Sequence, residues 1–186
     1  MTVGQRALRG CGFLLCVWLG LWHASRSVQA APTPEYLIKA AYLYNFALFV
    51  EWPADAFPTP TAPIVIGVVG ADPFEAALDR TIRDKRVNNR PVVVKRLGWA
   101  QDLRTCHILF VSSSEAARAP ELRTRLDGLP ILLVGETPEF ARRGGTINFT
   151  IDDNKVKLEV NVDAARRARL NISAKLLRVA RIVRGG

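Results

Sequence analysis

The chain has 186 residues, with 26 Lys and Arg against 17 Asp and Glu, and a formal net charge of +9. Hydrophobic residues make up 49% and charged residues 23%, which excludes an intrinsically disordered chain. Three cysteines and two histidines exclude a disulfide-dense scaffold and leave little material for a zinc or histidine-based catalytic site.

The first thirty residues have the pattern of a secretory signal peptide. Two arginines precede the apolar run CGFLLCVWLGLW (11–22), which is too short to span a bilayer comfortably. Val28 and Ala30 then place small residues at the positions that favour cleavage before Ala31. An uncleaved anchor is the alternative. We expect a signal peptide at 1–30, a single domain at 31–186 and export to the periplasm, with Cys106 as the only cysteine of the mature chain.

Residues 35–51 (EYLIKAAYLYNFALFVE) predict a helix that ends at Trp52-Pro53, because proline disfavours a helical conformation at the residue before it. The segment is apolar on nearly every side, and only Lys39 and Asn45 interrupt it. Such a helix is buried on more than one side, either by its own sheet or by a partner.

Apolar runs at 64–69, 92–97, 107–112 and 130–134 predict four buried parallel strands. Helices are expected between them at 73–82, with Asp72 as the cap and Pro73 in the first position, and at 113–126; a short helix is expected at 137–142. Right-handed crossovers give these four strands the spatial order 2-1-3-4.

Two alternating segments flank Asp153-Asn154 and predict a β-hairpin at 146–152 and 155–162. In the only register that satisfies every pair, Ile151, Phe149 and Ile147 face Val156, Leu158 and Val160 on one side, which we expect to be buried. The opposite side carries polar residues and is expected to face water.

Helices are then predicted at 164–170 and 174–183. The fold class is therefore α/β, a single three-layer domain with a mostly parallel sheet of about six strands, a C-terminal hairpin at one edge and flanking helices.

Catalytic patterns are missing from the sequence. The turn at 67–72 lacks the glycine spacing of a phosphate loop, and Cys106 and His107 are neighbours on a strand, so their side chains point to opposite faces. Ser112-Ser113-Ser114 lacks a nucleophile elbow and fits a helix cap. We therefore expect that the protein is not an enzyme and that it has no catalytic residue, no metal and no cofactor. The basic C-terminal residues favour a solvated face or contact with anionic lipid or an acidic partner, and export argues against nucleic acid.

The order of several segments resembles the YfiR family of periplasmic proteins. They are IKAAYLYNF (38–46), EWP (51–53), IGV (66–68), DPF (72–74), CHILFVS (106–112), GGTINF (144–149), EVN (159–161) and KLLRVA (175–180). The resemblance implies a periplasmic repressor that binds the sensor domain of an inner-membrane diguanylate cyclase or kinase, and so controls cyclic di-GMP and biofilm formation. The disulfides of the best-known members do not carry over, because the mature chain has one cysteine.

Partner contacts are expected at two places. Phe46, Phe49 and Trp52 form an aromatic set, although core packing is the commoner role of aromatic residues in such a helix, and Asn148, Glu159 and Asn161 lie on the polar face of the hairpin. Whether the protein also forms a homodimer stays open. The alternative functions are a small-ligand sensor using the crevice near Gly70 and Ser112, and a hydrolase without a recognised motif.

Overall fold

The computed structural model describes residues 33–185, so the predicted signal peptide lies outside the described residues. The helices are α1 (Pro34–Phe49), α2 (Ala76–Ile82), α3 (Ala119–Leu126), α4 (Val162–Arg167) and α5 (Ala174–Leu177). The strands are β1 (Val50–Glu51), β2 (Ile64–Val69), β3 (Arg86–Val87), β4 (Arg90–Leu97), β5 (Ile108–Val111), β6 (Leu132–Gly135), β7 (Ile147–Asp152), β8 (Lys155–Asn161), β9 (Asn171–Ile172) and β10 (Ala180–Val183).

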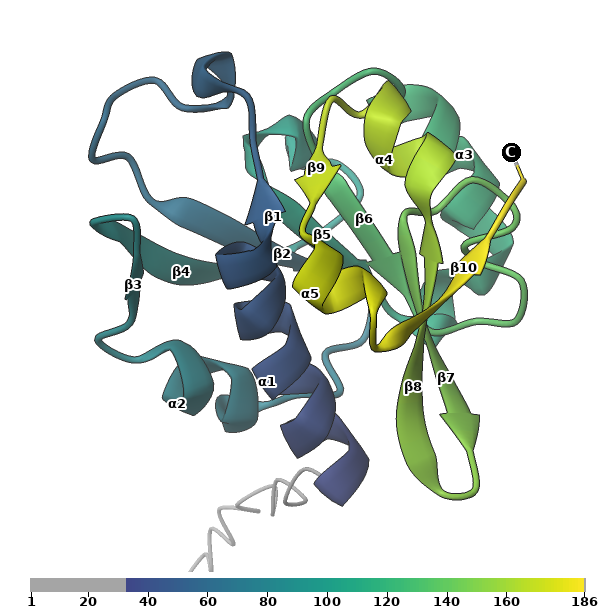
Figure 1. The fold of residues 1–186 in the computed structure, drawn as a ribbon. Coiled ribbons are helices and arrows are strands. Elements are labelled where there is room, and N and C mark those ends of the chain that lie inside the picture. Colours follow the sequence, from purple (N-terminus) through teal and green to yellow (C-terminus); the bar gives the residue numbers. More distant parts are fainter. Residues whose placement is uncertain (1–32, 186) are drawn as a thin grey trace, which may run out of the picture. The chain divides into compact units, whose positions relative to one another are not determined.

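Within residues 33–185, eight strands form one sheet in the order β10-β8-β7-β6-β5-β2-β4-β3 (Figure 1). The four central strands are parallel and have the predicted relative order. The β7–β8 hairpin joins the sheet through β6 and has the predicted register, in which Phe149 faces Leu158 and Ile151 faces Val156. The two-residue strands β1 and β9 pair separately, where the chain leaves α1.

Helices cover both faces of the sheet, so the predicted three-layer architecture is confirmed. On one face, α1, α2 and α5 bury a cluster built around Phe46, Phe74 and Phe110. On the other face, α3 buries a second cluster that includes Leu109, Leu122 and Cys106. Alternate residues of β2 contribute to the two clusters, which is why this strand is buried along its whole length.

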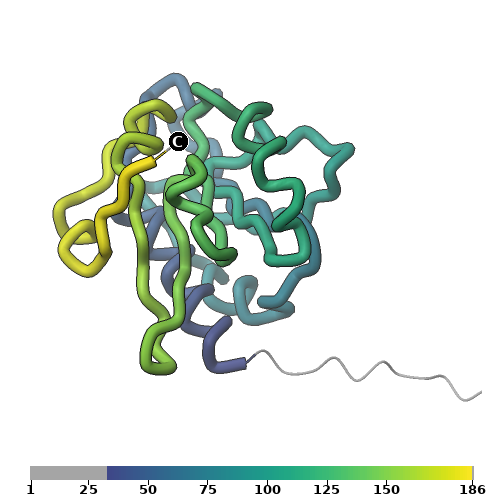
Figure 2. The backbone as a smooth tube through the Cα atoms, turned by 90° about the vertical axis from the view of Figure 1, so that its right-hand side faces the viewer, coloured from purple at the N-terminus to yellow at the C-terminus, as the bar shows by residue number. Residues whose placement is uncertain are grey.

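The segment 174–183 was predicted as one helix, and this prediction was wrong. Ser173 caps the helix as expected, with its hydroxyl accepting a hydrogen bond from the backbone N–H of Leu176. The helix ends after Leu177, and the chain continues as β10, which pairs in parallel with β8. The hairpin is therefore not the edge of the sheet, because β10 lies outside it (Figures 1 and 2).

The polar face of the hairpin was predicted to face water, and this is wrong for its base. Thr146, Asn148, Glu159 and Asn161 are all buried. The turns at 136–145 and the C-terminal segment cover them: the Asn161 side-chain amide donates to the carbonyls of Ala141 and Gly185, both at 2.8 Å. The tip of the hairpin, which projects past the end of the sheet, is exposed on both faces (Figure 2), and Ile151, which was predicted to be buried, is 50% exposed.

Several helices also differ from those predicted: α2 begins at Ala76 and not at residue 73, and α4 is Val162–Arg167 and not 164–170. The expected short helix at 137–142 is a series of turns, and the segment 113–126 begins as a 3-10 helix before α3.

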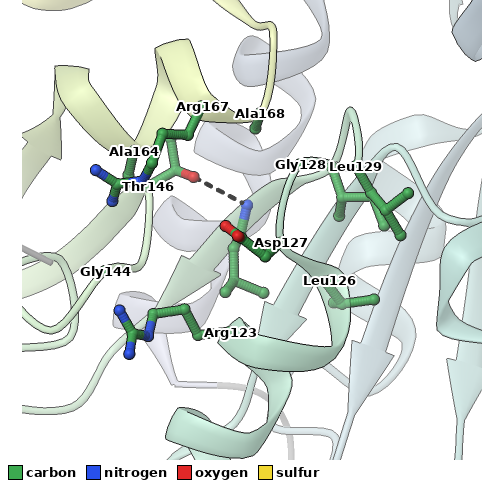
Figure 3. Close-up of a pocket in the computed structure, with 12 residues that line it drawn as sticks. Arg123, Leu126, Asp127, Gly128, Leu129, Gly144, Thr146, Ala164, Arg167 and Ala168 are labelled. Atoms are coloured by element: carbon green, nitrogen blue, oxygen red, sulfur yellow. Dashed lines mark hydrogen bonds between the residues drawn. The ribbon is translucent and has the colours of Figure 1, made fainter.

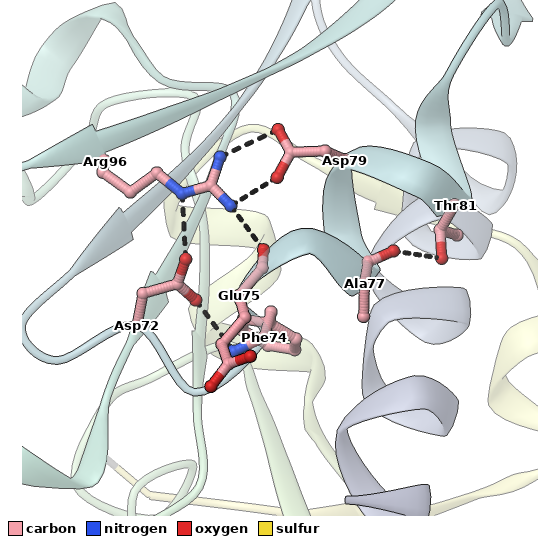
Figure 4. A network of polar contacts seen from close by, with 7 residues as sticks. All are labelled: Asp72, Phe74, Glu75, Ala77, Asp79, Thr81 and Arg96. Carbon is pink, nitrogen blue, oxygen red and sulfur yellow. Dashed lines mark hydrogen bonds and ion pairs between the residues drawn. The ribbon is translucent and has the colours of Figure 1, made fainter. Parts of the chain in front are cut away.

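Asp72 does not cap α2, although the sequence predicted that it would. Its carboxylate accepts from the N–H of Phe74 at 2.8 Å and from Arg96, which also forms a bidentate pair with Asp79 inside α2 (Figure 4). The Arg96 guanidinium lowers the pKa of Asp79.

Candidate partner-binding surface

The outward side of α1 is an apolar surface in contact with water. Ala40, Leu43 and Ala47 point to the sheet and are buried, as the apolar side of a packed helix usually is. The opposite side carries Leu37 (46% exposed), Ile38 (47%) and Leu48 (44%), with the exposed Ala41 between them. We call these four residues the α1 outer face.

The α1 outer face has the properties of an interaction site. Half-buried Tyr44 and Phe49 border it, and the half-buried Asn45, one turn after Ala41, is the polar residue that interrupts it. Single exposed apolar residues are ordinary on a protein surface, but contiguous ones indicate contact with another molecule. The sequence indicated this face through the lack of polar residues in α1 and did not say which of its residues would be exposed.

The three aromatic candidates lie at different depths. Phe46 is fully buried; its ring lies 6.1 Å from that of Tyr42 and 5.8 Å from that of Phe149. It therefore supports α1 from beneath and offers no surface in this conformation. Phe49 and Trp52 are half-buried, and the indole N–H of Trp52 donates to the carbonyl of His107 at 3.3 Å.

The polar hairpin candidates form a row across three strands. Asn148, Glu159 and Arg181 are register neighbours on β7, β8 and β10. The Asn148 amide donates to the Glu159 carboxylate at 3.4 Å, and Glu159 forms an ion pair with Arg181. The Glu159 side chain is 4% exposed and that of Arg181 is 69% exposed, so this row reaches solvent through the arginine.

Asn161, the third polar candidate, has a structural position. It is the N-cap of α4, and its side-chain oxygen accepts from the N–H of Ala164 at 2.9 Å. Together with the bonds to Ala141 and Gly185, this satisfies both ends of its amide. Asn161 thus holds three segments together and is fully buried.

A buried ion pair that the sequence did not reveal anchors α1 to the sheet. Lys39 lies 2.7 Å from Glu136, and both side chains are 4% exposed. Glu35 provides a second carboxylate at 2.5 Å, and the backbone N–H of Ser113 donates to Glu136 at 3.1 Å. Burial and the charge of Glu136 raise the pKa of the neighbouring Tyr36 to about 12. The available signal was a lysine within an apolar helix, but its partner is 97 residues away.

Cys106 and His107 have the structural roles that the sequence indicated. Cys106 is buried in the second cluster, and burial raises the pKa of its thiol to about 11. Nδ1 of His107 accepts a hydrogen bond from the backbone N–H of Val65 at 3.1 Å, and Nε2 lies 3.2 Å from the carbonyl oxygen of Ala56. This pattern requires the neutral ring protonated on Nε2, and burial lowers its pKa accordingly.

The region proposed for a small ligand, near Gly70 and Ser112, is closely packed around Gly70. A Cβ atom placed on Gly70 would lie 2.6 Å from side-chain atoms of Ser114 and Glu115, and the Ser114 hydroxyl accepts from the N–H of Ala71. A crevice of about 50 Å³ does lie between α3 and α4, where Arg123 and Arg167 approach it (Figure 3). That volume accommodates one or two water molecules.

Within residues 33–185, no group of three or more His, Cys, Asp or Glu side chains is placed to hold a metal ion. The helices of this part of the chain are all too short or too polar to cross a membrane.

Comparison with known families identifies one match. The family described as YfiR/HmsC-like matches residues 36–181, from the first turn of α1 into β10. The chain belongs to the YfiR/HmsC-like family. Comparison with curated protein sequences finds no match.

Membership in the YfiR/HmsC-like family indicates a periplasmic, non-catalytic regulator of diguanylate cyclase signalling that acts with a membrane signalling protein. The match includes the α1 outer face, the Asn148–Glu159–Arg181 row and the β7–β8 hairpin.

Proposed function

We propose that the mature protein binds the periplasmic sensor domain of an inner-membrane diguanylate cyclase and holds it inactive, so that cyclic di-GMP and biofilm formation stay low. The α1 outer face is the observation that carries this proposal. Three large aliphatic side chains that are each almost half exposed give a binding protein a surface without any catalytic group.

Burial of the α1 outer face would add measurably to the affinity for a partner. Full burial of a Leu or Ile side chain contributes about 1.5–3 kcal/mol, so burying the exposed part of each contributes about 1 kcal/mol. Leu37, Ile38 and Leu48 together would contribute about 3 kcal/mol, or about a hundredfold in affinity. Phe49 borders this surface, and Phe49 and Trp52 are proposed to extend it.

Glu159 is proposed to act indirectly. Its carboxylate is buried and holds Arg181 at the surface, so it positions a cation and does not itself contact the partner. The buried Asn148 and Asn161 maintain the strands and the turns around this cation. The candidate contact of the polar hairpin region is thus Arg181.

Ala41→Glu tests the proposal. Ala41 is exposed at the centre of the α1 outer face, and glutamate is a good helix former, so the variant should fold. Ala117→Glu is the matched control, because it adds the same side chain at an exposed position beyond β5, in the 3-10 helix before α3. Both are expressed in cells of the native host that lack the gene, and cyclic di-GMP is measured.

We expect the wild type and Ala117→Glu to lower cyclic di-GMP to the parental level. Ala41→Glu should leave it high while the protein accumulates normally in the periplasm, because a carboxylate buried without a partner opposes association. Full repression by Ala41→Glu would refute the assignment of this surface. An unchanged cyclic di-GMP level on loss of the gene would refute the proposed function itself.

A further inference from the structure

β10 is an edge strand with one neighbour. It pairs with β8 from Ala180 to Val183, and within residues 33–185 no strand pairs with its other side. The two-residue turn of the hairpin makes Lys155, Lys157 and Glu159 the residues that bond to β7, so Leu158 and Val160 bond to β10. By the same alternation, Arg181 turns its backbone groups to β8, while Ala180 and Ile182 turn theirs to the free edge.

The side chains along this edge are unusual for a free strand. Ile182 is 56% exposed, and Val179, immediately before the strand, is 64% exposed. Proteins commonly protect an edge with charges, and β10 has Arg181 between its apolar residues. Protection alone does not account for two large aliphatic side chains in water beside unpaired backbone groups.

The charges around β10 favour one kind of occupant. Arg178, Arg181 and Arg184 follow the edge at intervals of three residues, and all are exposed. Lys157 and Arg181, with one carboxylate, that of Asp152, line a groove of about 480 Å³ at the side of the hairpin, so cations outnumber acids there. Pairing of two copies of β10 would bring Arg181 of both copies into one ladder, with Arg178 and Arg184 of each copy just beyond its ends, and like charges brought together in this way oppose pairing. A strand that carries acidic side chains would instead pair opposite charges across the ladder.

We propose that β10 binds an extended segment of the partner by strand addition, and that this segment alternates apolar residues with Asp or Glu. The apolar residues lie beside Ala180 and Ile182, on the α1 face of the sheet, and the acidic residues lie beside Arg181, on the opposite face. This inference rests on the proposed function, because it names the chemistry of one segment of the same membrane partner.

Ile182→Pro is the decisive variant. Proline removes only the N–H of residue 182, which points to the free edge, so pairing with β8 is retained. Ile182→Thr is the matched control, since it keeps the N–H and is β-branched. The probe is a fluorescein-labelled peptide, Glu-Val-Glu-Ile-Glu-Val-Glu, and its binding to the mature protein is measured by fluorescence anisotropy. A second peptide has lysine in place of each glutamate.

We expect the acidic peptide to bind the wild type, Ile182→Thr to bind within about threefold of it, and Ile182→Pro to bind at least tenfold more weakly. The lysine peptide should not bind. Equal binding of Ile182→Pro and Ile182→Thr, equal binding of both peptides, or no binding to the wild type would each overturn the proposal. Thermal unfolding shows that the proline variant is folded; if it is not, Ala180→Pro, whose N–H also points outward, replaces it.

In cells, Ile182→Pro and Ala41→Glu separate the two proposals. Loss of repression with Ala41→Glu and full repression with Ile182→Pro would refute strand addition and leave the proposed function intact. Partial loss of repression with Ile182→Pro, and none with Ile182→Thr, is the result that strand addition predicts.

Discussion

Replacement of Lys39 by methionine tests how α1 is held on the sheet. Lys39 and Glu136 are both almost fully enclosed, at 2.7 Å, so Lys39→Met leaves a buried carboxylate without a cation, with the Ser113 N–H and the Tyr36 side chain beside it. Removing one partner of a buried pair costs about 3–5 kcal/mol. Because 1 kcal/mol shifts the Tm of a domain of this size by about 2–4 °C, the Tm should fall by about 10 °C.

The double variant Lys39→Met/Glu136→Leu should recover most of this loss. Replacing a buried pair by apolar residues of similar volume is often neutral, so we expect stability within about 2 kcal/mol of the wild type and a coupling energy of at least about 2 kcal/mol. Glu35→Gln is the control, because Glu35 is 38% exposed and its pairing with Lys39 should contribute less than about 1 kcal/mol.

Urea denaturation at pH 7 measures the wild type, Lys39→Met, Glu136→Leu, the double variant and Glu35→Gln. A loss below about 1 kcal/mol for Lys39→Met, or a double variant whose loss equals the sum of the two single losses, would refute the view that this pair anchors α1.

Further predictions concern the residues at and near the start of β5. Burial lowers the pKa of His107, so the unfolded chain binds protons more readily than the folded chain. The contribution of His107 to stability should therefore be fully present above about pH 6.5 and should fall as the pH drops below that value. His107→Asn should flatten this pH dependence, as measured by urea unfolding at about pH 5.5 and 7.5. A Cβ on Gly67 would lie 2.5 Å from the Cys106 sulfur, so Gly67→Ala should lose about 1–3 kcal/mol and Cys106→Ala should restore part of it; no recovery would contradict the contact. The Cys106 thiol, with a pKa raised to about 11, should react with a thiol reagent at pH 8 only after unfolding, and rapid labelling of the native protein would contradict its burial.

The central sheet could be predicted because each strand is a local signal. Apolar runs separated by helix-length segments and joined by right-handed crossovers leave few arrangements, and the alternation around Asp153-Asn154 permits one register. The end of the chain could not be predicted in this way. Leu176, Val179, Ala180 and Val183 fit a helical stripe, but pairing with the β8 edge places the last two in a strand. Such long-range pairing overrides a local pattern.

The candidate site was predicted in outline and missed in detail. Apolar residues on every side of α1 indicated a surface for a partner, yet Phe46 is buried and Leu37, Ile38 and Leu48 are exposed, because the packing direction of the helix is set by the sheet beneath it. Glu159 was expected on a wet face, which the turns at 136–145 and the C-terminal segment cover. Alternation along a strand reveals the two faces but not what packs on them.

Direct binding to the cyclase tests the central claim most directly. The partner is the diguanylate cyclase whose deletion abolishes the rise in cyclic di-GMP on loss of this protein, and its isolated periplasmic domain is titrated with the mature chain by calorimetry. We predict that the wild type and Ala117→Glu bind with equal affinity and that Ala41→Glu binds at least tenfold more weakly. Equal affinity of all three, or no association of the wild type, would contradict the account.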